Sequence, residues 1–126
     1  MKKVIATTQA PAAIGPYSQA IQVDKFLFAS GQLGLIPETG AFPEGGVKEQ
    51  AAQAFKNIRA ILTEADYGLG DIVKTTVFLA DINDFAVVNE VYATQFDGAY
   101  PARSAVAVKS LPKNGLVEVE VIAYKG

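Results

Sequence analysis

The stretch Val117-Glu118-Val119-Glu120-Val121-Ile122-Ala123-Tyr124 alternates apolar and polar residues before it becomes wholly apolar. Side chains of a β-strand point alternately to opposite faces, so the three valines share one face and the two glutamates share the other. Ile122 and Tyr124 continue the glutamate face, which makes that face only half polar. We therefore expect a strand with one face in a hydrophobic core. Its other face fits a subunit interface or a pocket wall better than open solvent.

The segments before this strand supply elements that can cover its apolar face. Residues 47–65 carry apolar side chains at three- and four-residue spacing, which predicts an amphipathic helix. A second helix is expected over residues 85–96, with Asn83 and Asp84 as capping residues. Strands are expected near the N-terminus and at residues 20–23, 26–29, 71–79, 103–108 and 116–124. This order predicts an α+β fold in one domain, residues 1–126, with one mixed sheet and both helices on one of its faces.

The composition limits the chemistry that is available to the chain. It has 126 residues, a net charge of −2 and a pI of about 5.0, which gives no general attraction to nucleic acid. It has no cysteine and no histidine, so any reaction must use carboxylates, hydroxyls, Lys, Arg, backbone groups or water. No phosphate loop, dinucleotide fingerprint or metal-ligand cluster appears, and we expect no metal and no cofactor. No stretch approaches the ~18 apolar residues of a membrane span. A cytoplasmic protein is the default expectation.

Arg103 is the residue most suggestive of function. It opens an apolar, strand-like run, so we expect its charge to be buried and to need a partner. That partner is either a carboxylate of the chain, Glu118 or Glu120, or a bound anion. Arg103 shares a strand face with Ala105 and Ala107, and two small side chains leave space beside a planar fork of five N–H donors. Such a fork suits a carboxylate ligand.

Four further residues are candidates for lining a site. Tyr17 follows a rigid Gly-Pro turn and either closes the edge of the core or faces a ligand. Ser30 and Gly31 end an apolar strand, where they either form a bulge or let a ligand approach backbone N–H groups. Asn89 lies one position outside the apolar stripe of the second helix, and it is either a boundary residue or a pocket residue. The pattern alone leaves these alternatives open.

Six segments together resemble the reactive intermediate deaminase family, the Rid or YjgF-like proteins, in order and at family spacing over essentially the whole chain. They are Gly15-Pro16-Tyr17-Ser18-Gln19, Ala29-Ser30-Gly31-Gln32, Val73-Lys74-Thr75-Thr76-Val77-Phe78-Leu79, Asn83-Asp84-Phe85, Pro101-Ala102-Arg103-Ser104 and Val117-Glu118-Val119-Glu120. The resemblance implies a chorismate-mutase-like α+β fold. It also implies a homotrimer with three active sites in clefts between subunits.

Archetypal members of this family hydrolyse enamine and imine intermediates, such as 2-aminoacrylate and 2-imino acids, to 2-keto acids and ammonia. The resemblance implies that Arg103 binds the substrate carboxylate, that Glu118 positions the attacking water and that Tyr17 supports the site. It also implies three lining residues: Ser30, Gly31 and Asn89. Only the family motif, and not the strand pattern, favours Glu118 over Glu120 for this role.

A different class of function is the alternative. The chain can be a trimeric module that binds or senses a keto acid without turning it over. Ribonuclease activity, which has been attached to some relatives, is less attractive here. RNA cleavage usually needs a titratable acid/base pair and a basic surface, and this chain is acidic and lacks histidine.

Overall fold

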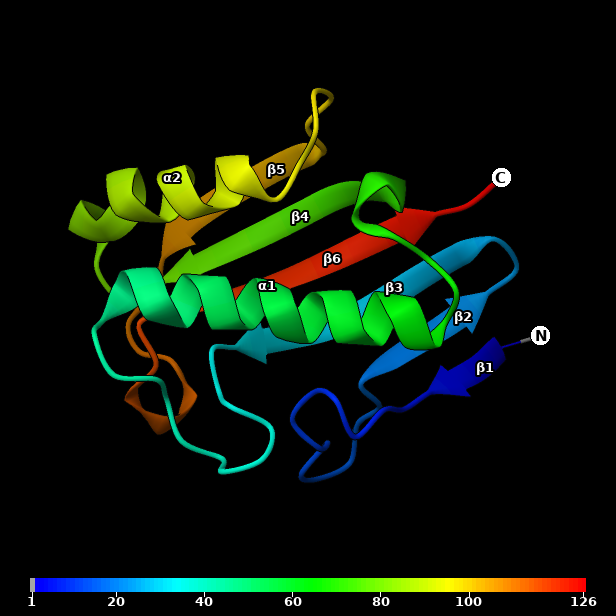
Figure 1. Ribbon diagram of the computed structural model, residues 1–126, viewed down its shortest axis with the longest axis horizontal. Coiled ribbons are helices and arrows are strands. Elements are labelled where there is room, and N and C mark those ends of the chain that lie inside the picture. The colour runs from blue at the N-terminus through cyan, green and yellow to red at the C-terminus, as the bar shows by residue number, and fades with distance from the viewer. Residues whose placement is uncertain (1) are drawn as a thin grey trace.

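In the computed structural model, which describes residues 2–126, one six-stranded sheet carries two α-helices on one of its faces (Figure 1). The strands in chain order are β1 (Lys2–Ile5), β2 (Ala20–Val23), β3 (Phe26–Leu33), β4 (Ile72–Leu79), β5 (Ala102–Ala107) and β6 (Val117–Tyr124). The helices are α1 (Val47–Glu64) and α2 (Phe85–Thr94). The predicted element order, the mixed sheet and the one-sided helices are confirmed.

The strand β6 lies inside the sheet, whose order is β1-β2-β3-β6-β4-β5. It pairs antiparallel with β3 and with β4, and the parallel pair β4–β5 makes the sheet mixed. Its valines are buried under the helices as predicted, with Val117 and Val119 at 0% and Val121 at 2% exposure. Glu118 is half-buried and Glu120 is exposed on the opposite face.

Helix α1 provides most of the cover. Its apolar positions follow the predicted spacing, and the side chains of Ala51, Phe55, Ile58, Ile61 and Leu62 are fully buried. Burial of each of the larger side chains among them contributes about 1.5–3 kcal/mol to the stability of the fold. A polar residue of α1, Asn57, is also fully buried and donates hydrogen bonds to the carbonyls of Leu33 (3.1 Å) and Leu35 (2.9 Å). It thereby fixes the chain where β3 ends.

One local expectation is wrong and one holds in part. Arg103 is exposed rather than buried, because β5 is an edge strand that pairs only with β4. Asp84 is the N-cap residue of α2 as predicted, but its side chain makes no cap bond; the cap bond comes from Asp81, whose carboxylate accepts from the backbone N–H of Asn83 at 2.9 Å. A 3-10 turn, Ile82–Asp84, moves the cap upstream. Neither helix in the described residues is long and apolar enough to cross a membrane.

The sheet face away from the helices carries an exposed aromatic cluster. Phe26, Phe28 and Tyr124 are 41%, 45% and 40% exposed. Their rings pack together, with centroids 6.1 Å apart for Phe26–Phe28 and 4.9 Å apart for Phe26–Tyr124. Ile122 pairs with Phe28 on the same face. The half-polar character predicted from the sequence therefore extends across neighbouring strands, and no helix of residues 2–126 covers this face.

Candidate functional site

Arg103 lies on the helix side of the sheet edge, against α2. Its Nη1 donates to Asn89 Oδ1 at 2.7 Å, and its Cζ lies 4.7 Å from the ring centroid of Tyr92 and 5.3 Å from that of Phe85. Phe85, Asn89 and Tyr92 are spaced four and three residues apart, which places them on one helix face. The side of the sheet follows from the register, because Arg103 pairs with the fully buried Thr75.

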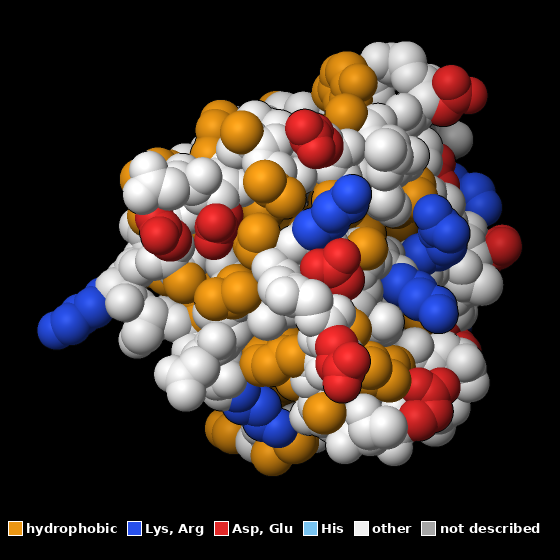
Figure 2. Space-filling model, turned by 60° about the vertical axis from the view of Figure 1, so that its left-hand side comes forward, with side chains coloured by type: hydrophobic (Ala, Val, Ile, Leu, Met, Phe, Trp, Pro, Cys, Tyr) orange, Lys and Arg blue, Asp and Glu red, His pale blue; other side chains and the backbone are white. Residues whose placement is uncertain are grey.

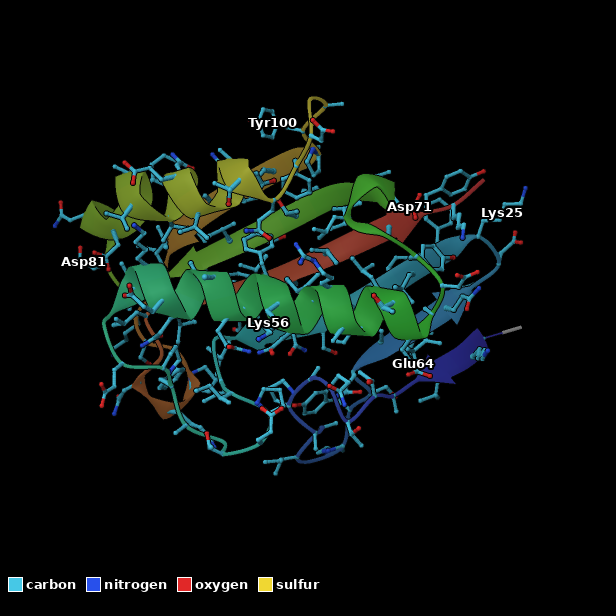
Figure 3. The ribbon with its side chains drawn as sticks, viewed as in Figure 1. Lys25, Lys56, Glu64, Asp71, Asp81 and Tyr100 are labelled. Atoms are coloured by element: carbon cyan, nitrogen blue, oxygen red, sulfur yellow. The ribbon has the colours of Figure 1, made fainter. Side chains whose placement is uncertain are left out.

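The guanidinium borders a cavity of about 460 Å³ that is lined by Asn89, Tyr92, Ala93, Tyr100, Pro101 and Arg103. Tyr100 projects from the loop between α2 and β5 at the rim of this region (Figure 3). The guanidinium has five N–H donors, and within residues 2–126 its one hydrogen bond is to Asn89. The remaining donors are free to bind an anion.

Glu118 belongs to a second constellation, at the end of β3. The pairing of β3 with β6 shifts register between Ala29 and Gln32, so Ser30 and Gly31 form the bulge that was one of the two sequence interpretations. A Cβ on Gly31 would lie 2.9 Å from Glu118 Cδ and Oε2, so only glycine lets the carboxyl group rest against this backbone. Partial burial, and secondarily the charge of Glu120, raise the pKa of Glu118 above its ordinary value.

The loop that carries Tyr17 is tied to the same bulge. Ser30 Oγ donates to the carbonyl of Ser18 at 2.7 Å, so this hydroxyl holds the loop. Gln19, 4% exposed, accepts from the backbone N–H of Thr7 at 2.7 Å and donates to the carbonyl of Pro11 at 2.7 Å. Sequence reasoning missed Gln19, although it closes the Gly15–Gln19 motif. Tyr17 itself is 52% exposed and does not close the core.

Tyr17, Ser30, Gly31 and Glu118 line one cavity of about 730 Å³. The loop of residues 11–17, the chain after β3 and the turn at Pro112 and Lys113 form its other walls. These segments gather at the lower edge of Figure 1. No group of three or more acidic residues able to hold a metal ion occurs in the described part of the chain.

The two constellations lie on opposite faces of the sheet. Arg103 pairs with Thr75 and Glu118 pairs with Phe78, and Thr75 and Phe78 are three residues apart on β4. An odd separation along a strand places side chains on opposite faces. An internal salt bridge from Arg103 to Glu118, or to Glu120 on the same face as Glu118, is therefore ruled out within one chain. The one ion pair of residues 2–126 is Lys125–Asp66.

Comparison with known proteins identifies the family. The family model described as endoribonuclease L-PSP matches residues 7–125. The chain is 55% identical to the 2-iminobutanoate/2-iminopropanoate deaminase of Mus musculus, over 100% of this chain and 93% of that protein. It is also 50% identical to RidA from the Antarctic bacterium Psychrobacter, with a TM-score of 0.94 over 98% of this chain and 99% of that one. The chain belongs to the Rid (YjgF-like) family.

A solved structure with a bound small molecule is also similar. The crystal structure of TdcF from Escherichia coli with bound serine has a TM-score of 0.94 at 45% identity, over 98% of this chain and 99% of that one. The family prediction made from the six segments is thus confirmed.

Charges of both signs are interspersed with hydrophobic groups on the face seen in Figure 2, without a broad area of one charge.

Sequence reasoning also missed the aromatic residues around the guanidinium. Phe85 and Tyr92 belong to the apolar stripe of the second helix, and they pack toward the core. A signal was present, since aromatic residues four before and three after Asn89 bracket it on one helix face. The apolar spacing within the helix cannot show that an arginine from a strand, Arg103, lies near both rings.

Proposed function

We propose that the chain is a 2-iminobutanoate/2-iminopropanoate deaminase, a hydrolase that converts 2-imino acids and their enamine tautomers to 2-keto acids and ammonia. Curated relatives about half identical over the whole chain carry that name, including those of Mus musculus, Rattus norvegicus and Homo sapiens. The observation that carries the proposal is the set of groups found: a guanidinium with free donors and a half-buried carboxylate of raised pKa. Imine hydrolysis needs an anion receptor and a weak base, and neither histidine nor cysteine.

Arg103 is the proposed receptor for the substrate carboxylate. Two parallel N–H···O bonds fix both the position and the plane of a carboxylate, and charge-assisted bonds contribute about 1.5–3 kcal/mol each. Asn89 takes one donor of the guanidinium from the side and leaves the others available. The imino carbon, which is directly attached to the carboxylate, is thereby held at a fixed place.

Glu118 is the proposed base. A protonated imine is already electrophilic, so the carboxylate only has to orient a water molecule and accept its proton as oxygen bonds to carbon. Glu118 then returns the proton to the nitrogen of the resulting carbinolamine. The C–N bond breaks and releases ammonia, and Glu118 takes the hydroxyl proton as the carbonyl forms. A raised pKa brings the carboxylate closer to the operating pH, where proton transfer is most efficient and contributes about 10²–10⁴-fold.

The assembly we propose is a homotrimer in which one copy supplies Arg103 and the next copy supplies Glu118. Two observations support it: the two groups lie on opposite faces of one sheet, and an exposed aromatic cluster lies on the glutamate face. Tyr17, Ser30 and Gly31 accompany Glu118 from the same copy. Ser30 acts there through its ties to the Tyr17 loop, because its hydroxyl donates to the carbonyl of Ser18 and its backbone N–H donates to the carbonyl of Gln19.

The test supplies the unstable imine in place, by dehydrating serine with a dehydratase, and follows pyruvate with and without this chain. We expect faster pyruvate release with wild type and none of the acceleration with Arg103→Ala. Arg59→Ala is the matched control, because Arg59 is the other arginine of the chain and lies exposed on α1. Equal rates for wild type and Arg103→Ala contradict the proposal. Calorimetric binding of 2-ketobutyrate without any turnover would favour the non-catalytic binding module instead.

A further inference from the structure

The guanidinium of Arg103 lies over the ring of Tyr92, whose hydroxyl is hydrogen-bonded. Tyr92 is 4% exposed, and its hydroxyl lies 2.8 Å from Thr75 Oγ1, a side chain with no exposure. Thr75 is also the cross-strand neighbour of Arg103 in the β4–β5 pair. The residue that pairs with Arg103 across the two strands is therefore hydrogen-bonded to the ring over which the guanidinium of Arg103 lies.

The ring of Tyr92 is also held by its edges. Phe55 of α1 packs against it edge-on at 5.7 Å, and Phe96 lies 5.0 Å from it and also contacts Phe55. A buried pair of hydroxyl groups adds no packing that a Phe and a Val would lack. The hydrogen bond between the two hydroxyl groups instead limits movement of the ring, because a bond at the para position restricts how the ring can shift against its neighbours. Phe85, the other ring near Arg103, is only half-buried and has no such bond.

We propose that Tyr92 is a positioning residue for Arg103, presenting a fixed aromatic plane that holds the exposed guanidinium ready for a carboxylate. An arginine on an edge strand would otherwise sample many rotamers, and the entropy of fixing it would weaken ligand binding. A cation over an aromatic face gains electrostatic attraction while all of its hydrogen-bond donors stay available. Tyr92 against one face of the guanidinium and Asn89 at one of its edges therefore define the plane of the guanidinium. This inference rests on the proposed role of Arg103 as the carboxylate receptor.

The chain allows a direct readout, because Arg59 and Arg103 are its two arginines. Their side-chain Nε–H groups give two signals in a nitrogen–proton NMR spectrum, and Arg103→Lys removes one of them and so assigns both. A proton above an aromatic ring is shifted upfield, so the Arg103 signal reports the ring beneath it. The Arg59 signal, from α1, serves as the internal control. Binding of 2-ketobutyrate, measured by calorimetry, is the second readout.

We expect Tyr92→Leu to move the Arg103 signal toward that of Arg59 and to weaken 2-ketobutyrate binding about tenfold. Tyr92→Phe keeps the ring but loses the hydrogen bond to Thr75, so both readouts should fall between those of wild type and those of Tyr92→Leu. Phe96→Leu is the matched control, because it removes a neighbouring ring of the same cluster that does not contact Arg103. If the leucine variant does not fold, Tyr92→Met repeats the test with a longer side chain filling the site.

Two outcomes would overturn the inference. One is a Tyr92→Leu protein whose Arg103 signal and 2-ketobutyrate affinity match wild type. The other is a Phe96→Leu protein that changes both readouts as much as Tyr92→Leu does, which would reveal general loosening of the cluster. Failure of the proposed role of Arg103 as carboxylate receptor gives a different result, since 2-ketobutyrate would then leave the Arg103 signal of the wild-type protein unmoved.

Discussion

Two inactive variants of this protein should restore activity when they assemble together. Arg103→Ala removes the guanidinium from the helix side of the sheet, and Glu118→Gln removes the carboxylate from the opposite side. In the proposed ring of three, each site takes Arg103 from one copy and Glu118 from the next. A ring containing both variants then has one interface where an intact arginine meets an intact glutamate. We expect about one third of the wild-type rate per trimer.

The assay uses co-expression of the two variants with different affinity tags, followed by purification on both tags so that each particle contains both chains. Pyruvate release from dehydratase-generated imine gives the rate, and each variant purified alone gives the background. Particles that carry two tags on chains of the same variant are the matched control. A mixed particle no faster than this control would refute the division of the site between copies, and so would two active variants measured alone.

Three further perturbations test the glutamate side and its support. Glu120→Gln removes a charge that raises the pKa of Glu118, so the loss of activity on acidification, as Glu118 becomes protonated, should move to lower pH; an unchanged pH–rate profile contradicts this. Gly31→Ala pushes the Glu118 carboxyl group aside and should lower the rate by about 10²-fold, whereas Gly70→Ala, where a Cβ meets nothing, should not. Asn57→Leu leaves two carbonyls unpaired and should lower the free energy of unfolding by about 2–4 kcal/mol in urea titrations; a loss below half of that contradicts the role of Asn57 as a tie.

The elements of the fold were predictable because their signals are local. The spacing in α1 and the alternation in β6 each depend on one segment, and both appear as expected. The burial of Arg103 was predicted wrongly, because an apolar run predicts a strand and not whether that strand lies inside the sheet or at its edge. Strand order is a non-local property, and here it places β5 at the end of the sheet.

The relation between Arg103 and Glu118 was not accessible from the sequence for a related reason. Alternation assigns faces within each strand, but it does not relate the faces of two strands to one another. That relation passes through β4, where the partners of the two residues, Thr75 and Phe78, are separated by an odd number of residues. A shift of one residue in either pairing would have placed both side chains on one face. The internal salt bridge was therefore a reasonable alternative until the register was known.

The same register has a chemical consequence. A guanidinium in contact with Glu118 would lower the pKa of that carboxyl group and occupy the donors that a substrate carboxylate needs. With the sheet between them, Glu118 keeps its raised pKa and Arg103 keeps its free donors. On the proposed assembly, the two groups meet only across a cleft between copies, where a bound substrate carboxylate neutralises the guanidinium before the imino carbon reaches the base. A site divided between chains thus keeps a strong anion receptor and a weak base from cancelling each other.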